Sequence, residues 1–261
     1  WPFHTWSPVG HVAAPTAVSM IHAGVLMKIG AFGVLRLGIF LCPEGWRYWA
    51  ELMGVLATVG IVYGALAGLR QTDLKFVIGY SSVSHMGIVG LGLATVSLEG
   101  VNGAVFQMFS HGIISPMLFL IAGVIYDRAH TREIAGFGGL ADRLPEYTGM
   151  TGLAFMASLR LPGLAGFVGE VLVFLGGFGA ANHGFRVLVA VGALSVIITA
   201  AYYLWTMQRM FLGKLNEKWA GLWDMNWRER ATLYPLAAIT IILGVWPTPI
   251  FNLINTSLHA L

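Results

Sequence analysis

The chain has 261 residues, of which 57% are hydrophobic and only 10% are charged, and its mean hydropathy is +0.74. Soluble domains carry about 25% charged residues and roughly 45–50% apolar ones. Seven membrane helices of about 20 apolar residues would use nearly all of this apolar content. The composition therefore predicts an all-α, polytopic membrane protein, and it excludes a disordered chain, a disulfide scaffold and a large extramembrane catalytic domain.

The charged residues are 15 Lys and Arg against 12 Asp and Glu, which gives a formal net charge of +3. In a membrane chain, such a basic excess is typical of cytoplasmic loops rather than of nucleic-acid binding. The single cysteine, Cys42, cannot build an iron–sulfur cluster or a four-cysteine zinc site. We therefore expect no nucleic-acid partner, and no metal ion or cofactor bound by this chain.

Seven long apolar segments alternate with short polar ones, and each is predicted to be a membrane helix. They run over residues 15–41, 49–69, 76–96, 101–126, 148–179, 187–212 and 231–254. No linker separates them, so residues 1–261 are expected to form one membrane domain. Because the chain begins at Trp1 within a motif and lacks a basic signal-peptide segment, we interpret it as part of a longer subunit.

The basic residues predict how the helices are oriented. If residues 1–14 lie on one side of the membrane, alternation places the loops 70–75, 127–147 and 213–230 on the same side, called here the basic side. Ten of the 15 Lys and Arg residues lie at the basic side, three lie at the opposite side and two lie within apolar segments. The basic side is therefore predicted to be cytoplasmic.

Four ionisable residues lie deep in four different apolar segments. They are Lys28, His85, His111 and Glu170. A charge at the centre of a membrane helix costs at least about 2.5–3.5 kcal/mol on insertion scales, so such a residue is normally buried in the bundle beside a partner or water. Taken singly, each of them could be a hydrogen-bonded structural residue. Together, at similar depth, they favour a path for protons.

Further polar residues accompany the two histidines. Ser81 and Ser82 precede His85 by about one helical turn, and Gln107 lies one turn before His111 on the same helical face. A polar file across neighbouring helices is what a hydrated proton path requires. These three residues are therefore predicted to support the proton path.

The histidine pair also has a different interpretation. His85 and His111 lie on consecutive helices and could be the two axial ligands of a membrane haem. A haem needs a large apolar slot, and this interpretation leaves Lys28 and Glu170 without a role. A haem-binding membrane anchor is nevertheless kept as an alternative function.

The fifth apolar segment contains Leu161-Pro162-Gly163, which is expected to break the helix, because proline removes a backbone hydrogen bond and glycine loosens the turn. Broken helices at membrane depth commonly mark ion sites, although a simple proline kink is the alternative. Arg160 and Glu170 flank the break. Their spacing on a straight helix is about 15 Å, so each charge is expected to be compensated by its own half-helix, without a direct salt bridge.

Several sequence motifs recur in a known family of membrane proteins. They are Trp1-Pro2-Phe3-His4-Thr5-Trp6, Ala14-Pro15-Thr16-Ala17, Gly24-Val25-Leu26-Met27-Lys28, Thr72-Asp73-Leu74-Lys75, Tyr80-Ser81-Ser82-Val83-Ser84-His85-Met86-Gly87, Tyr126-Asp127-Arg128-Ala129-His130-Thr131-Arg132-Glu133-Ile134 and Leu161-Pro162-Gly163-Leu164-Ala165-Gly166-Phe167-Val168-Gly169-Glu170. Over nearly the whole chain up to about residue 212, these motifs resemble the antiporter-like subunits of respiratory complex I. The resemblance is strongest to the M type, or chain 4, because the L-type, N-type and sodium/proton antiporter relatives typically have lysine where this chain has Glu170.

The resemblance implies a fold with two inverted five-helix repeats, of which this chain would supply the second. It implies that Lys28 connects two half-channels and that Glu170 is the carboxylate of the broken helix. It further implies that His85 and His111 are relay histidines. Arg160 departs from the family, because a small residue usually precedes the Leu-Pro-Gly break.

The resemblance implies that the chain is a proton-translocating, non-redox membrane subunit of an NADH:quinone oxidoreductase, in the bacterial cytoplasmic membrane. NADH, flavin, iron–sulfur clusters and quinone would then be bound by partner subunits. The partners would be L-type and N-type antiporter-like subunits, other membrane-arm subunits and the lipid bilayer. A subunit of a multisubunit Na⁺/H⁺ antiporter and a subunit of a membrane-bound hydrogenase-type complex remain as alternatives.

Overall fold

The computed structural model describes residues 1–180 and 182–258, which form helices joined by short loops. The α-helices are α1 (Trp6–Ala13), α2 (Thr16–Ile21), α3 (Met27–Gly33), α4 (Pro43–Leu69), α5 (Leu74–Ala94), α6 (Leu98–Ala129), α7 (Pro145–Ser158), α8 (Ala165–Gly179), α9 (Gly184–Phe211), α10 (Trp227–Val245) and α11 (Thr248–Leu258). A π-helical segment, η1 (His22–Leu26), joins α2 and α3, and a second one, η2 (Val34–Leu41), extends α3, so that residues 16–41 form one continuous helix. The loops contain three short 3-10 turns, η3 (Ile134–Gly136), η4 (Leu140–Asp142) and η5 (Glu217–Trp219). The prediction of an all-α fold is confirmed.

All seven predicted apolar segments are helical. Within the described residues, five helices are long and apolar enough to cross a membrane: Thr16–Leu41, Pro43–Leu69, Leu74–Ala94, Leu98–Ala129 and Gly184–Phe211. The bent pair α10 and α11 could form a sixth crossing. The fifth predicted segment is divided into α7 and α8, and each of these is shorter than a full membrane crossing.

The last predicted segment, 231–254, is not one straight helix as expected. It is divided between α10 and α11, which are bent by 76° relative to each other. The bend lies at Trp246 and Pro247. Proline has no backbone N–H and disfavours helical backbone at the residue before it. Trp246 accordingly leaves the helical region, with φ −131° and ψ 75°.

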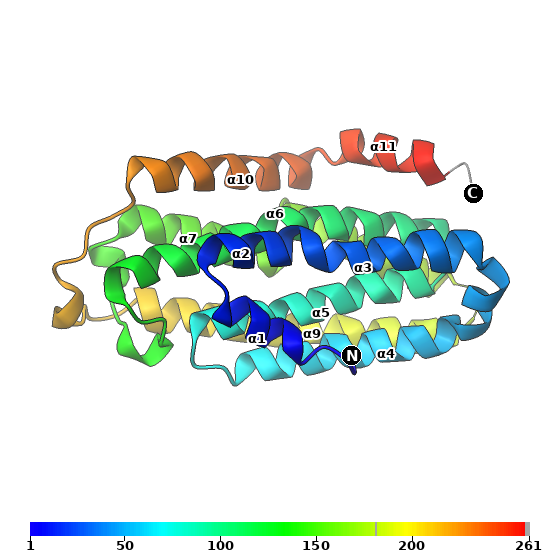
Figure 1. Ribbon diagram of the computed structural model, residues 1–261, viewed down its shortest axis with the longest axis horizontal. Helices are drawn as coiled ribbons and strands as arrows, with labels where there is room; N and C mark the ends of the chain where they lie inside the picture. The colour runs from blue at the N-terminus through cyan, green and yellow to red at the C-terminus, as the bar shows by residue number, and fades with distance from the viewer. Residues whose placement is uncertain (181, 259–261) are drawn as a thin grey trace.

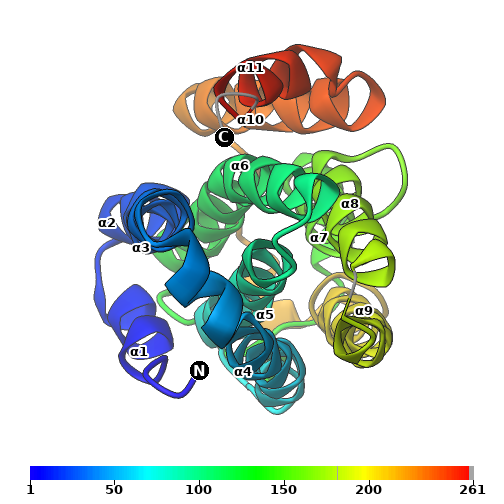
Figure 2. The same ribbon diagram turned by 90° about the vertical axis from the view of Figure 1, so that its right-hand side faces the viewer.

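Helix α5 lies at the centre of the bundle. Figure 2, which looks along the helices, shows α5 enclosed by α1, α4, α6 and α9, whereas α10 and α11 lie outside α6. α4 approaches α5 closely because Gly64 faces it, since a Cβ atom at Gly64 would lie 2.7 Å from the backbone nitrogen of Ser84. Residues on nearly every face of α5 are therefore buried, including Ser81, Ser82 and His85.

The loops predicted to share the basic side lie together at one end of the bundle, on the left of Figure 1. The backbone nitrogen of Ile134 donates to the carbonyl of Thr72 over 2.8 Å, and that of Asn216 donates to the carbonyl of Gly138 over 3.1 Å. These bonds link the loop after α4 to the loop after α6, and that loop to the loop after α9. The predicted grouping of these three loops is confirmed.

Ion pairs reinforce the same end. Arg128 lies 2.7 Å from Glu229, which joins the end of α6 to the start of α10. Arg132 lies 3.1 Å from Asp73. Asp73 also caps the N-terminus of α5 by accepting a hydrogen bond from the backbone nitrogen of Lys75 over 2.7 Å. The start of α5 is thus held by both local and long-range bonds.

Residues 1–14 do not form a loop at the basic side, which corrects the expectation. They contain α1, which packs along α5. Only the end of α1 reaches the basic side, where the Nζ atom of Lys75 donates to the carbonyl of Ala14 over 2.6 Å. Trp1 instead lies beside the middle of α4, since a Cβ atom at Gly60 would be 3.6 Å from the Cβ atom of Trp1. Lys75 thus supplies a donor to the carbonyls at the C-terminal end of this short helix, which its own backbone leaves unpaired.

The single cysteine provides a test of the orientation. Cys42 is exposed and lies between η2 and α4, at the end opposite the basic side. We expect an impermeant maleimide to label Cys42 from the outside of intact cells. A cysteine introduced by Glu133→Cys in a Cys42→Ser background should be labelled only in inverted vesicles. Cys42→Ser alone is the control, and labelling of both positions from the same face would contradict the orientation.

Candidate functional site

Lys28 is placed by the π-helical turn that precedes it. It is the second residue of α3, and its Nζ atom donates to the carbonyl of Ala23 in η1. η1 lies close to α6 because Gly24 faces Pro116, where a Cβ atom would meet the proline ring at 2.7 Å. The Nζ atom of Lys28 then lies 2.6 Å from Nδ1 of His111. π-Helical turns are frequent at functional sites.

The two predicted relay histidines are in contact. His85 on α5 and His111 on α6 are only 3% and 2% exposed. Their ring centroids are 5.2 Å apart, and their planes meet at 83°. The Nε2 atoms of both rings are buried and have no hydrogen-bond partner among the described residues. Because buried polar atoms are normally paired, these nitrogens have capacity to accept or donate a transferred proton.

The predicted break in the fifth apolar segment is confirmed. α7 ends at Ser158 and α8 begins at Ala165, with Pro162 exposed between them. Arg160 lies in this break and has a φ of 64°, in the left-handed region. Residues other than glycine are rarely found there, and such a conformation costs about 1–3 kcal/mol. The surrounding structure must therefore hold Arg160 in place.

Arg160 and Glu170 form a direct ion pair, which corrects the expectation that each charge is compensated separately. Nη1 of Arg160 donates to Oε1 of Glu170, and the two residues are 4% and 3% exposed. The straight-helix spacing does not apply, because the chain leaves the helix after Ser158. Gly166 lets α8 fold back closely, since a Cβ atom there would lie 3.4 Å from Cγ of Arg160.

The supporting residues predicted from the sequence differ in their surroundings. Ser81 accepts a hydrogen bond from the hydroxyl of Tyr203 over 2.9 Å. Ser82 donates to the carbonyl of Ile78 within its own helix over 3.2 Å. Gln107 lies beside α8, because a Cβ atom at Gly169 would be 2.9 Å from its Oε1 atom. Ser81 also donates to the carbonyl of Ile78, so both serines bond to their own helix, and of the two Ser81 is the one bonded to another helix.

The sequence analysis missed Tyr203, which is fully buried on α9. Its hydroxyl accepts a hydrogen bond from Ser158 over 2.8 Å and donates to Ser81. It therefore ties the end of α7 to the centre of α5. A polar stripe at spacings of three and four residues could have revealed this face of α9. The stripe consists of Ser195, Thr199, Tyr202, Tyr203 and Thr206.

Two basic residues accompany the histidine pair. Lys28 contacts His111. Arg160 follows Ser158, whose hydroxyl donates to Tyr203, and Tyr203 donates to Ser81, one turn before His85. Arg160 in turn is paired with Glu170. The cluster thus draws on α3, α5, α6, the break, α8 and α9.

The histidine geometry argues against the haem alternative. The rings of His85 and His111 meet edge to face, and Nδ1 of His111 is engaged by Lys28. A flat macrocycle between two axial ligands needs rings on opposite sides of its plane. Within the residues that the structure describes, no group of three or more His, Cys, Asp or Glu side chains could hold a metal ion.

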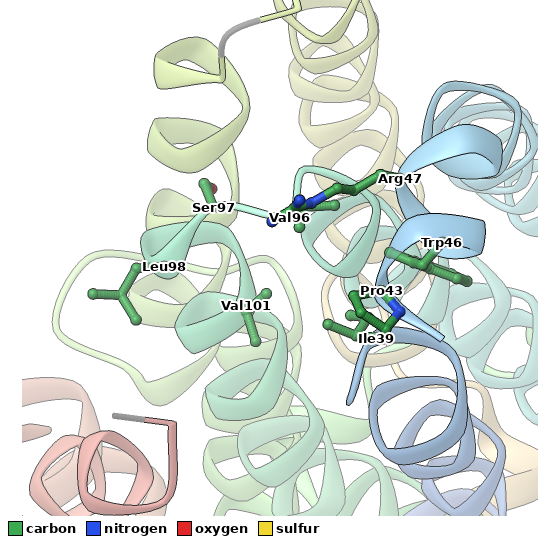
Figure 3. A pocket seen from close by; sticks show the side chains of 8 residues that line it. All are labelled: Ile39, Pro43, Trp46, Arg47, Val96, Ser97, Leu98 and Val101. Carbon is green, nitrogen blue, oxygen red and sulfur yellow. The ribbon is translucent and has the colours of Figure 1, made fainter. Parts of the chain in front are cut away.

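The cavities of the molecule lie outside this cluster. Figure 3 shows a pocket of about 310 Å³ between the η2–α4 corner and the α5–α6 turn, and its one charged lining residue is Arg47. A larger groove of about 840 Å³ runs along α1, α3 and α4, with a mostly apolar lining. Neither cavity is lined by Lys28, the histidine pair or Glu170.

The chain is similar to membrane subunits of respiratory complexes. Residues 1–199 match the family described as NADH:quinone oxidoreductase/Mrp antiporter, TM. NADH-quinone oxidoreductase subunit M of Rhodobacter capsulatus is 47% identical over 259 residues, which cover 98% of this chain and 50% of that protein. F(420)H(2) dehydrogenase subunit M of Methanosarcina mazei is 41% identical over 260 residues, which cover 98% of this chain and 51% of that protein.

A solved structure supports the same relationship. The respiratory complex I of Thermus thermophilus with bound NADH contains a chain that superposes with a TM-score of 0.88 at 32% identity, covering 95% of this chain and 51% of that one. The chain spans about half the length of the curated relatives that it matches. The resemblance to M-type subunits drawn from the motifs is confirmed. This chain belongs to the NADH:quinone oxidoreductase/Mrp antiporter family of membrane subunits.

Proposed function

We propose that this chain forms part of a proton-translocating membrane subunit of an NADH:quinone oxidoreductase. The proton path would lead from Lys28 through the histidine pair to Glu170. The observation that carries the proposal is the contact of 2.6 Å between Nζ of Lys28 and Nδ1 of His111, in the interior of an apolar bundle. Intramembrane ionisable residues that face one another are typical of proton relays.

The geometry suits proton transfer from Lys28 to the histidine pair. A proton passes between groups within about 2.6–3.2 Å, or through one water, and the Lys28–His111 contact lies in this range. The rings of His85 and His111 touch, and each has a free Nε2 atom among the described residues. Glu170 stands near the start of a half-helix, where broken helices bring polar groups to membrane depth.

In this proposal the chain moves protons and performs no redox chemistry. NADH, flavin, iron–sulfur clusters and quinone would be bound by partner subunits, and quinone reduction there would drive the protons here. The partners would include L-type and N-type antiporter-like subunits, and the location would be the bacterial cytoplasmic membrane. The names of the relatives support this assignment, since each is a subunit of an oxidoreductase or dehydrogenase.

The alternative cargo is Na⁺, as in a multisubunit Na⁺/H⁺ antiporter. Hard cations are held by several oxygen ligands. Glu170 is the one carboxylate of the cluster, and its Oε1 atom is already engaged by Arg160. The remaining members, Lys28 and the two imidazoles, are nitrogen groups that repel or poorly ligate such an ion. The composition of the cluster therefore favours H⁺.

Lys28 provides the first test of the proton path. In the complete subunit, assembled in its native complex, Lys28→Ala should lower proton pumping by on the order of tenfold or more, because it removes the donor to His111. Pumping is measured as dye quenching in vesicles. NADH oxidation with an artificial acceptor should survive, because no redox group is assigned to this chain.

The matched control is Lys214→Ala, which removes an exposed lysine from a loop at the basic side. This variant should pump at the wild-type rate. Normal pumping by Lys28→Ala would contradict the proposed path. Failure of the Lys28→Ala complex to assemble would show that the residue is structural.

Tyr203 tests whether a buried hydroxyl near the cluster stabilises the fold without carrying protons. Tyr203→Phe removes the hydroxyl that bonds to both Ser158 and Ser81. The free energy of unfolding should fall by about 1–3 kcal/mol, because the buried hydroxyls of Ser158 and Ser81 lose this partner. A lowered thermal unfolding temperature is the expected result, with most of the pumping retained at low temperature. Complete loss of pumping in a stable Tyr203→Phe complex would show instead that the hydroxyl is part of the path.

A further inference from the structure

The guanidinium of Arg160 has more donors than partners. Nη1 donates to Glu170, whereas Nε and Nη2 are buried and have no partner among the described residues. Arg128 is the contrasting case, because its Nη1 and Nη2 atoms donate to both oxygens of Glu229 over 2.8 and 2.7 Å, and its Nε atom donates to the carbonyl of Trp223 over 2.9 Å. Arg128 is therefore fixed on several sides, whereas Arg160 is held to its carboxylate by one nitrogen.

The two partners of the buried pair stand on different kinds of backbone. Glu170 is within α8 and moves only with that helix. Arg160 lies in the non-helical break, with a left-handed backbone, between two half-helices. The backbone of the break is itself hydrogen-bonded, since the nitrogen of Arg160 donates to the carbonyl of Ala157 over 3.1 Å. The guanidinium can change partners by rotation of its own long side chain between staggered rotamers, while α7 and α8 stay in place.

Other polar groups lie close to the break. Tyr203 accepts a hydrogen bond from Ser158, packs against Tyr202 with ring centroids 4.6 Å apart, and donates to Ser81, one turn before His85. Nε2 of His85 and the hydroxyl of Tyr202 are buried and unpartnered within the described part of the chain. Both can accept a hydrogen bond from a guanidinium. The titratable groups on which the charge of Arg160 acts are His85 on α5, His111 on α6, and Tyr202 and Tyr203 on α9.

We propose that Arg160 is a positioning residue that acts as an electrostatic latch on Glu170, alternating between the carboxylate and the side of His85 and Tyr202. While paired, Arg160 keeps Glu170 ionised. When a proton reaches Glu170, the carboxylate becomes a neutral acid and its attraction for the guanidinium is lost. Arg160 keeps its own proton throughout. When Glu170 releases the proton, its negative charge returns and the pair forms again.

This inference rests on the proposed proton path and adds a regulation step to it. A buried carboxylate without a counter-charge takes up a proton rather than remaining charged. If Arg160 is the latch, removing its charge therefore leaves Glu170 permanently protonated and unable to cycle. Replacing it by another cation should preserve the cycle. The measurement that tests the latch is therefore the protonation state of Glu170.

Infrared spectroscopy of the purified complex tests the latch. Arg160→Gly is the main variant, because glycine suits the left-handed backbone at this position. It should show a protonated carboxyl stretch at neutral pH that is absent from the wild type and from the double variant Arg160→Gly with Glu170→Gln. Its pumping should fall severalfold. Arg160→Gln is a second neutral variant with the same expected result, should the glycine variant not assemble.

Two further variants separate charge from structure. Arg160→Lys retains the cation, so it should show no carboxyl band and should keep more than half of the pumping. Arg128→Gln breaks the multiply bonded pair at the basic side and should show no band. Absence of the band in the neutral Arg160 variants, or a band in Arg160→Lys, would overturn the latch alone. Normal pumping by Glu170→Gln would instead overturn the proposed proton path, and the latch with it.

Discussion

Lipid cannot solvate a charge, so each ionisable side chain at membrane depth must find its partner inside the protein. Lys28 lies far in the sequence from Arg160 and Glu170, and none of the three has a partner within its own turn of helix that could neutralise it. The central position of α5 resolves this constraint, because helices packed around one buried helix bring their inner faces together. The charges meet the histidine pair at this centre.

The charged residues of the cluster stand where the backbone departs from the regular α-helix. Lys28 follows a π-helical segment, and Arg160 lies in the break between α7 and α8. In a regular helix each carbonyl accepts a hydrogen bond from the backbone of the same helix. The π segment makes the carbonyl of Ala23 available to Lys28, and the break lets Arg160 reach Glu170. Irregular backbone is tolerated at this depth because it is covered by neighbouring helices.

Two arginine–glutamate pairs, one part-buried at the basic side and one buried at the centre, differ in how many hydrogen bonds hold them. Arg128 and Glu229 share two hydrogen bonds at the basic side, and further bonds to backbone carbonyls complete the guanidinium. Such a pair fixes the ends of α6 and α10. Arg160 and Glu170 share one donor in the interior. The guanidinium at the basic side is therefore held by more hydrogen bonds than the guanidinium at the centre.

The apolar segments and the four central residues could be identified from the sequence alone. An apolar run of about 20 residues is long enough to cross a bilayer as a helix, and its length can be read directly from the sequence. A Lys, His or Glu inside such a run is rare and is therefore easily noticed. What the sequence did not reveal is how the chain runs where these helices bend or break. On a straight helix Arg160 and Glu170 would be too far apart to touch, but the helix breaks between them and they form an ion pair. Residues 231–254 were expected to form one straight span, but the helix bends by 76° at Pro247.

Only the tertiary structure decided which of these residues touch. The contact of Lys28 with His111 depends on a π-helical turn and on the close approach of Gly24 to Pro116. The ion pair of Arg160 depends on a left-handed residue and on the return of the chain into α8. A sequence pattern shows which residues neighbour one another on the same helix. Contacts between helices depend on where the backbone bends and how closely neighbours pack, and these are set by the whole bundle.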